Sequence, residues 1–194
     1  MYRIISGKWK GKKIAAPKNF DVRPTTDFAK EALFSMIENK YELEFSSVLD
    51  LFAGIASISF EFASRGCNDI TAVEQNAKHT TFIHTTAAEL DMSLQINIQR
   101  ADVYDWLKKN RSKKQYDIIF VDPPFMETDE KKYTEILNLI QNHKYLKPNG
   151  TLILEHQTKL KLAHENLIES RKYGNITFSF FQFPVEGSSV EEKI

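Results

Sequence analysis

The stretch Val48-Leu49-Asp50-Leu51-Phe52-Ala53-Gly54-Ile55-Ala56-Ser57 joins an apolar run to a turn of small residues. The run predicts a buried strand over residues 48–52, and a helix is expected from Ile58 to Ser64. Small residues between the two elements allow the backbone to approach a ligand closely. Such a turn serves simple packing about as often as ligand contact, so other segments must decide between the two.

Short apolar runs and helical segments continue to alternate downstream of this stretch. Strands are expected over residues 70–74, 96–98, 116–121 and 151–155, and helices over 77–90, 103–110 and 133–143. A turn is expected at 147–150, and Gly174-Asn175 joins the two strands of a hairpin, 170–173 and 176–181. The pattern predicts an α/β fold with a doubly wound, Rossmann-like sheet, mostly parallel with a C-terminal antiparallel hairpin.

The chain length favours one compact domain with a modest appendage, since 194 residues is little more than one typical domain. We expect a basic N-terminal extension and helix over residues 1–44, the α/β domain over 45–185 and a flexible tail over 186–194. Within the extension, Thr26 is expected to cap a helix over 27–38. The apolar stripe of this helix is expected to contain Phe28, Leu33, Phe34 and Ile37.

Charge is distributed unevenly along a chain whose formal net charge is zero. Residues 1–30 contain eight cationic and two anionic side chains, a net charge of +6, which the remaining 164 residues balance with −6. A basic arm on an acidic body is typical of a nucleic-acid-binding protein, although a solvated polar segment is the plainer interpretation. Trp9 and Phe20 in the arm favour RNA, because aromatic rings stack on unpaired bases.

Composition excludes several other classes. With 42% hydrophobic and 27% charged residues the chain is an ordinary globular protein, neither disordered nor of low complexity. The single cysteine, Cys67, is expected to be buried and fits a reducing compartment. His79 and His84 do not share a helix face, so no metal is expected, and His156 either borders a site or is structural. No long apolar segment is present, and we expect a cytoplasmic protein.

The segment Asp122-Pro123-Pro124-Phe125 follows the strand expected over residues 116–121. Two prolines fix the backbone, so the Asp122 carboxylate and the Pro123 carbonyl become rigid hydrogen-bond acceptors. Phe125 adds a planar face beside them. This set suits an amino group on an aromatic ring, whose N–H donors meet the acceptors while the ring stacks. The alternative is a proline-stiffened strand end with a core phenylalanine.

Two further acidic residues follow neighbouring strands. Glu74 lies 24 residues after Asp50, near the spacing at which a carboxylate in a nucleotide-binding α/β fold binds ribose hydroxyls. Asp102 follows the third strand, where it can accept a hydrogen bond from an adenine amine. Each of them can equally cap the following helix or be solvated.

These segments resemble a known family. Asp50 to Ser57 and Asp122 to Phe125 are similar to motif I and the catalytic motif of S-adenosylmethionine-dependent amino-methyltransferases. The blocks 3–13, 23–27 and 30–34 resemble specifically the bacterial 16S ribosomal RNA guanine-N2 methyltransferases that modify guanine 966. The resemblance covers about residues 2–182. It implies methyl transfer from S-adenosylmethionine to the N2 amine of a guanine, without a metal.

The resemblance also implies roles for individual residues. The target guanine would be bound by Asp122, Pro123, Pro124 and Phe125. The cofactor would be bound by Asp50, Phe52, Ala53, Gly54, Glu74, Gln75, Asp102 and Val103. The RNA would face Arg3, Lys8, Lys10, Lys12, Lys13, Arg23 and Thr25. The expected partner is 16S ribosomal RNA within a small-subunit particle, bound by a monomeric protein.

One departure from the family pattern lies in the cofactor turn. The family usually has glycine at the position of Ala56 and a small hydroxyl residue at that of Ile55. An added Cβ where the backbone approaches a ligand costs about 1–3 kcal/mol unless the turn shifts. We therefore expect weakened cofactor binding.

Other functions remain open at this stage. The same motif serves adenine N6 and cytosine N4 in DNA, and a relative with weakened cofactor binding could be a non-catalytic RNA-binding protein. A nicotinamide dehydrogenase is disfavoured, because only the first glycine of Gly-x-Gly-x-x-Gly is present, at Gly54. The phosphate-binding pattern Gly-x-x-x-x-Gly-Lys-Ser/Thr is absent from the sequence.

Overall fold

The computed structural model describes residues 2–17, 20, 25–111, 113–124 and 130–184. Its main feature is a seven-stranded sheet in the order β5-β4-β3-β6-β7-β9-β8. The strands are β3 (Ser47–Leu51), β4 (Asp69–Glu74), β5 (Ile96–Arg100), β6 (Tyr116–Val121), β7 (Leu146–Gln157), β8 (Leu167–Tyr173) and β9 (Ile176–Phe181). The first five of these strands are parallel, and β9 pairs antiparallel with both β7 and β8. The predicted mixed α/β sheet is confirmed.

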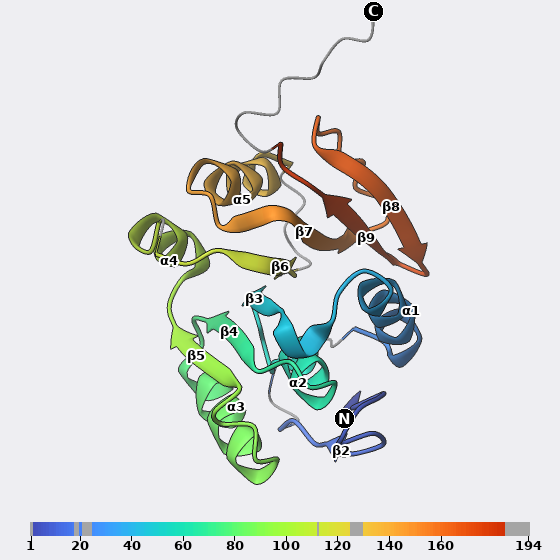
Figure 1. Ribbon diagram of the computed structural model, residues 1–194, viewed down its shortest axis with the longest axis vertical. Coiled ribbons are helices and arrows are strands. Elements are labelled where there is room, and N and C mark those ends of the chain that lie inside the picture. The colour runs from blue at the N-terminus through green and yellow to red at the C-terminus, as the bar shows by residue number, and fades with distance from the viewer. Residues whose placement is uncertain (1, 18–19, 21–24, 112, 125–129, 185–194) are drawn as a thin grey trace, which may run out of the picture.

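Helices cover both faces of the sheet. They are α1 (Asp27–Glu38), α2 (Ser57–Ser64), α3 (Ala77–Glu89), α4 (Val103–Lys109) and α5 (Glu130–Asn142). Figure 1 shows α4 and α5 on one side of the sheet and α1, α2 and α3 on the other. Two apolar cores result, one on each face. None of the helices in the described part of the chain is long and apolar enough to cross a membrane.

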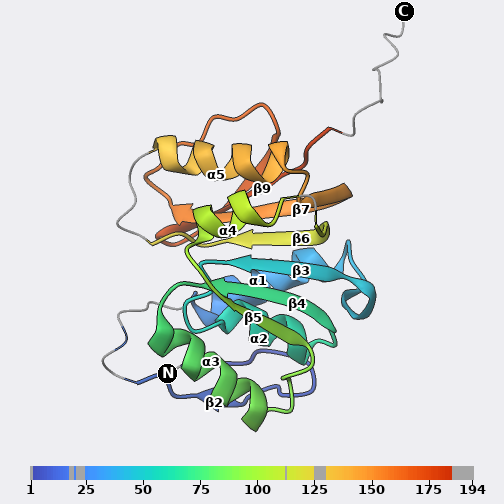
Figure 2. The same ribbon diagram turned by 90° about the vertical axis from the view of Figure 1, so that its left-hand side faces the viewer.

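The N-terminal residues form a small unit of their own. β1 (Tyr2–Arg3) and β2 (Lys13–Ile14) pair in an antiparallel two-stranded sheet. We call residues 2–17 the N-terminal arm. Figure 2 shows the arm beside α2 and α3, far from α5. A short 3-10 helix, η1 (Leu43–Phe45), precedes the main sheet. The division at residues 44 and 45 stays a prediction, and residues 185–194 lie outside the described part.

Thr26 caps α1 as predicted, and its side chain accepts a hydrogen bond from the Ala29 amide at 3.2 Å. The predicted apolar stripe is wrong at Phe28, whose exposed fraction is 73%. Ala29 and Lys30 are buried on the stripe instead, because the Lys30 ammonium lies 3.7 Å from the buried carboxylate of Glu61.

The expected turn at residues 147–150 lies inside a longer strand. Tyr116 pairs with Leu146 and Ile118 with Thr151, so three extra residues of β7 bulge out between the two pairs. The bulge accommodates Pro148, which cannot donate a hydrogen bond to a regular ladder. A strand interrupted in this way resembles a turn in the sequence.

Candidate active site

The two segments singled out in the sequence meet at the centre of the sheet. β3 and β6 are neighbouring parallel strands, and the helices that follow them, α2 and α5, lie on opposite faces. Ligands of open α/β sheets bind at such a point, outside the carboxyl ends of the strands. The Asp122 amide donates to the Leu51 carbonyl at 3.2 Å, so the segment after β6 is joined to the end of β3.

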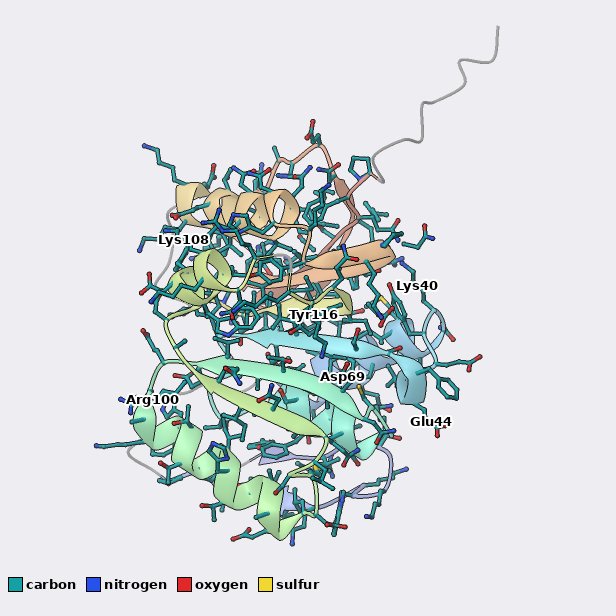
Figure 3. The ribbon with its side chains drawn as sticks, turned by 60° about the vertical axis from the view of Figure 1, so that its left-hand side comes forward. Lys40, Glu44, Asp69, Arg100, Lys108 and Tyr116 are labelled. Carbon is teal, nitrogen blue, oxygen red and sulfur yellow. The ribbon has the colours of Figure 1, made fainter. Side chains whose placement is uncertain are left out.

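Figure 3 shows the two edges of the sheet by labelled residues. Asp69 begins β4 at one edge, and Arg100 ends β5 at the opposite one, which is therefore the carboxyl edge. The candidate cofactor and acceptor residues lie in the last residues of the parallel strands or within a few residues after them, at this edge.

The turn after β3 has an unusual backbone. Phe52, Gly54 and Ala56 have φ values of 61°, 57° and 58°. A left-handed conformation costs a residue with a Cβ about 1–2 kcal/mol, whereas glycine adopts it freely. Ala56 is also the N-cap of α2 and provides no side-chain cap for the first amides of this helix. Ala56, where the resemblance implies glycine, therefore occupies a strained position.

Asp50 lies beneath this turn rather than on its surface. Its side chain is buried, and the Ser59 hydroxyl of α2 donates to Asp50 Oδ2 at 2.5 Å. Burial raises the pKa of Asp50 to about 7, the Ser59 hydrogen bonds oppose the rise, and the Glu74 charge adds to it. Asp50 thus fixes the turn to α2 in this structure, and its contact with a cofactor stays a prediction.

The side chain of Glu74, at the end of β4, points toward the turn that follows β3. Its Oε2 accepts from the Gly54 amide at 2.8 Å and its Oε1 from the Asn76 amide at 2.7 Å. His79 Nδ1 lies 3.6 Å from Glu74 Oε1. A carboxylate has about four lone-pair sites, so Glu74 can still accept from ribose hydroxyls. Gln75, the next residue, is exposed.

Asp102 and Val103 form the start of α4. Asp102 Oδ1 accepts from the Asp105 amide at 3.0 Å, which confirms the cap that the sequence left open. The Asp102 side chain is exposed at the carboxyl edge, and Val103 is buried beside it. Phe52 contacts Tyr104 edge to face with 6.2 Å between ring centroids, so the turn after β3 and the start of α4 are neighbours.

The acceptor side consists of Asp122, Pro123 and Pro124, while Phe125 lies outside the described residues. Pro123 is buried and Pro124 is exposed. Burial raises the pKa of Asp122 well above its usual range, and the charges of Glu155 and Asp50 raise it further. Asp122 therefore belongs to a group of three carboxyls at the ends of adjacent strands.

Glu155 is the site residue that the sequence reasoning missed. It lies near the end of β7, next to Asp122, and Thr25 Oγ1 donates to Glu155 Oε2 at 2.8 Å. Thr25, for which the resemblance implies RNA contact, is buried at the site, and that role stays a prediction. The sequence did contain a signal for it, because Glu155 is a carboxylate at the end of the apolar run 152–154, in the strand expected over residues 151–155.

The N-terminal arm exposes most of the cations assigned to RNA. Arg3, Lys8, Lys10, Lys12 and Lys13 are exposed, whereas Arg23 lies outside the described residues. Arg3 pairs with Asp27 at 2.9 Å, and Lys8 is 3.9 Å from Asp91. Lys30, one of the eight cationic residues in the first thirty positions, is fully buried and does not face the solvent.

Two aromatic residues near the N-terminus, one in the arm and one after it, pack partly against the protein's own core. Trp9 and Phe20 pack against the core, and the Phe20 ring lies 4.7 Å from that of His79. Their role as free stacking faces, expected from the sequence, is therefore restricted. His156 is structural here, because its Nε2 lies 2.8 Å from Ser179 Oγ and its Nδ1 lies 2.9 Å from the Gln157 carbonyl. Cys67 is buried as predicted.

Solved structures share this architecture. A candidate methylase from Haemophilus influenzae is 27% identical, with a TM-score of 0.75 and coverage of 93% of this chain and 97% of the other. A hypothetical protein from Thermus thermophilus, 22% identical, has a TM-score of 0.81 and covers 94% and 100%. The fold, together with the site at the carboxyl ends of β3 and β6, defines a Rossmann-like methyltransferase.

The chain belongs to the family described as Conserved hypothetical protein 95, whose model matches residues 2–182. A relative from Buchnera aphidicola subsp. Baizongia pistaciae, named Ribosomal RNA small subunit methyltransferase D, is 35% identical over 158 residues. That match covers 81% of this chain and 77% of the relative. The Haemophilus influenzae protein of the same name is 29% identical, with 93% of each chain covered.

Proposed function

We propose that this protein transfers a methyl group from S-adenosylmethionine to the exocyclic N2 amine of a guanine in 16S ribosomal RNA, of the guanine-966 type. The observation that carries the proposal is the position of Asp122, fixed by two prolines beside the strained turn that follows β3. The names of the relatives and the exposed cations of the N-terminal arm support the same function.

The residues present fit the cofactor. Ala56 provides no side-chain cap at the start of α2, and Phe52, Ala53 and Gly54 are only half-buried, so a ligand can reach this turn. When bound, S-adenosylmethionine supplies a methyl carbon that its positively charged sulfur makes electrophilic. In the proposal, Glu74 and Gln75 bind the ribose, Asp102 and Val103 the adenine, and Asp50 with residues 52–54 the methionine part.

The acceptor residues orient the amine. The Asp122 carboxylate and the Pro123 carbonyl accept its two N–H donors, which aligns the nitrogen lone pair and leaves room for one new N–C bond. The ionised form of Asp122 is the stronger acceptor, and only this form can also take up a proton from the amine. The nitrogen loses one proton as it gains the methyl group, and in this proposal Asp122 Oδ accepts that proton. Phe125 provides the stacking face in this proposal.

The biological setting follows from the substrate. The N2 amine is a Watson–Crick donor in a guanine–cytosine pair, so the target base must be unpaired or flipped out. We propose a small-subunit particle as the substrate, the cytoplasm as the location and a monomer as the active form, without a metal. The exposed large apolar side chains of the described residues, Phe28, Phe45, Leu94 and Ile168, lie on separate elements, which favours a monomer.

Replacement of Asp122 tests the proposal. Asp122→Ala should lower turnover by at least about a hundredfold, because an acceptor at the reacting nitrogen is lost, while cofactor affinity measured by calorimetry stays within about twofold. The matched control is Asp69→Ala at the amino edge of the sheet, which should leave turnover unchanged. Near-normal turnover of Asp122→Ala would contradict the assignment.

The acceptor itself is identified by mass spectrometry of nucleosides. Naked 16S ribosomal RNA, small-subunit particles lacking the modification and DNA are each incubated with the protein and the methyl donor. N2-methylguanosine from the particles is the expected product. Methyladenine or methylcytosine from DNA would favour the alternative acceptors, and no saturable heat with the cofactor at millimolar concentration would indicate a non-catalytic relative.

A further inference from the structure

The carboxyl group of Glu155 is held in an unusual way at the acceptor site. The residue is 1% exposed, and its Oε2 accepts a hydrogen bond from Thr25 Oγ1 at 2.8 Å. Its Oε1 is buried and has no hydrogen-bond partner among the described residues. A buried polar atom without a partner costs free energy, so native proteins rarely keep one unless a water, an ion or a ligand pairs with it.

The position of Glu155 relative to Asp122 follows from strand register. Val121 of β6 pairs with Leu154 of β7, so the next residues along the two chains, Asp122 and Glu155, lie side by side. Neighbouring strands are about 4.8 Å apart. The Glu155 charge raises the pKa of Asp122, an effect that requires the two carboxyls to be close.

The surroundings of Glu155 are apolar on the side away from Asp122. Phe178 of β9 lies directly opposite Glu155 in the antiparallel pairing and is fully buried. This environment raises the pKa of Glu155 to about 7 through burial, and the Thr25 hydrogen bond opposes the rise. Nothing on this side of the described structure competes for Oε1, which leaves it for a donor that arrives from the acceptor site.

Guanine carries two donors side by side on one edge, the N2 amine and the N1–H. Adenine and cytosine differ, because the ring nitrogen next to their exocyclic amine carries a lone pair instead of a hydrogen. Two neighbouring carboxyl groups therefore match guanine and oppose the other two bases, whose lone pair would face an oxygen.

We infer that Glu155 accepts the N1–H of the target guanine while Asp122 accepts its N2 amine, so that Glu155 selects guanine among the amine-bearing bases. Thr25 acts as a positioning residue, because its hydrogen bond to Oε2 directs the other oxygen to the base. This inference rests on the proposed function and adds the group that determines its specificity.

The test uses the full-length protein and two RNA substrates that differ only at the target position. One contains guanine, and the other contains 2-aminopurine, which keeps the 2-amino group but has a lone pair at N1. The wild-type protein should methylate 2-aminopurine with kcat/KM lower by about a hundredfold or more. 2-Aminopurine also lacks the O6 of guanine, which contributes to this difference in kcat/KM. The decisive measurement is therefore how the difference changes from the wild type to a variant.

Glu155→Gln is the decisive variant. Its amide can offer either an oxygen or an N–H to the base, so the preference for guanine over 2-aminopurine should fall at least about tenfold, with cofactor affinity unchanged. Contributions of O6 cancel in this comparison, since both proteins are measured on the same two substrates. The matched control, Glu165→Gln in the exposed loop between β7 and β8, should keep the wild-type ratio.

The pH profile supplies a second readout that a merely structural role would not change. The described carboxyls facing one another here are Asp50 on β3, Asp122 after β6 and Glu155 on β7. Wild-type kcat/KM for guanine should rise with pH from about 7 upward, as Glu155 and Asp122 ionise, because burial raises the pKa of both groups. Because the Glu155 charge raises the pKa of Asp122, Glu155→Gln should move this rise to lower pH.

The outcomes separate the inference from the function on which it rests. If the wild type methylates no guanine, the proposed function fails. If it methylates guanine and Glu155→Gln leaves both the base preference and the pH profile unchanged, the inference is overturned and the function stands. Should Glu155→Gln not fold, Thr25→Val provides the same comparison: a preference reduced several-fold supports the inference, and an unchanged one overturns it.

Discussion

Ala56 has a backbone conformation that suits glycine better than alanine. Its φ is 58° and its ψ is 35°, and the residue is fully buried at the start of α2. The Ala56 amide donates to the Ala53 carbonyl at 2.6 Å, so the turn is closed by its own backbone. Weakened cofactor binding stays a prediction, and the left-handed geometry of this one residue is the physical argument for it.

Ala56→Gly is expected to stabilise the protein and tighten cofactor binding. Relief of left-handed strain, about 1–2 kcal/mol, exceeds the extra chain entropy of glycine, about 0.5–1 kcal/mol, so the Tm should rise by about 1–4 °C. The dissociation constant of S-adenosylmethionine, measured by calorimetry, should fall by up to about tenfold.

Ala88→Gly on the exposed face of α3 is the control for this change. In ordinary helical conformation the same substitution should lower stability by about 1 kcal/mol. If Ala56→Gly destabilised the protein as Ala88→Gly does, the strain at residue 56 would have no energetic consequence.

At the scale of elements, the N-terminal arm is attached to α2 through its backbone. The amides of Ile5 and Ser6 donate to the buried Glu61 carboxylate at 2.9 and 3.0 Å. The Lys8 amide donates to the Ser64 carbonyl at 2.7 Å. Because Lys30 of α1 also meets Glu61, the arm and both helices depend on one buried carboxylate.

Gly7 is the position where this attachment is closest. Its φ is 81°, and a Cβ added there would lie 1.8 Å from the Ser64 carbonyl oxygen. Gly7→Ala should therefore lower the free energy of unfolding by about 2–4 kcal/mol or displace the arm, since neither backbone can yield without breaking hydrogen bonds. Denaturant unfolding measures the loss, and hydrogen exchange at the Lys8 and Trp9 amides locates it.

Gly11 offers an internal comparison with the same backbone conformation. Its φ is 82°, but a Cβ added there meets no heavy atom within 4 Å. Gly11→Ala should cost only the strain of the left-handed conformation, about 1–2 kcal/mol, and leave amide exchange on α2 unchanged. If both variants lost the same free energy of unfolding, backbone strain and not the contact with Ser64 would explain why residue 7 must be glycine.

At the scale of the whole molecule, the charge separation matters more than the net charge of zero. Lys10, Lys12 and Lys13 lie together on the exposed surface of the arm, and no carboxylate of the described residues pairs with them. Unpaired cations on one side of an otherwise acidic molecule attract RNA phosphates and release counterions when they bind them.

Replacement of these three lysines by glutamine should weaken RNA binding and its salt dependence together. The slope of log affinity against log salt should become shallower by about 2, because each phosphate of a single strand that a lysine neutralises adds about 0.7 to the slope. Fluorescence anisotropy with a labelled 16S fragment at several salt concentrations measures the slope. Lys113→Gln with Lys114→Gln, at the amino edge, should leave it unchanged; an equal effect per charge would mean that the arm is not the RNA-binding surface.

Local patterns were sufficient for much of the fold. Thr26 caps α1, and the apolar runs before Phe52 and Asp122 became neighbouring parallel strands, because capping and strand burial act over a few residues. The prediction for Phe28 was wrong because helix periodicity alone does not reveal that a polar residue can be buried when a distant charged residue pairs with it. Lys30 replaced it on the buried face, where its partner Glu61 lies 31 residues further along the chain.

By itself the sequence determined the alternation of strands and helices, the turn of small residues after β3 and the proline-fixed Asp122, since each depends on neighbours along the chain. Only the tertiary structure decided which carboxyl groups meet. Glu155 is 130 residues from Thr25 and 33 from Asp122 in the sequence, and β7 brings it beside both. Burial, charge coupling and the free oxygen of Glu155 arise from that meeting, because desolvation is a property of the packed molecule and not of any one segment.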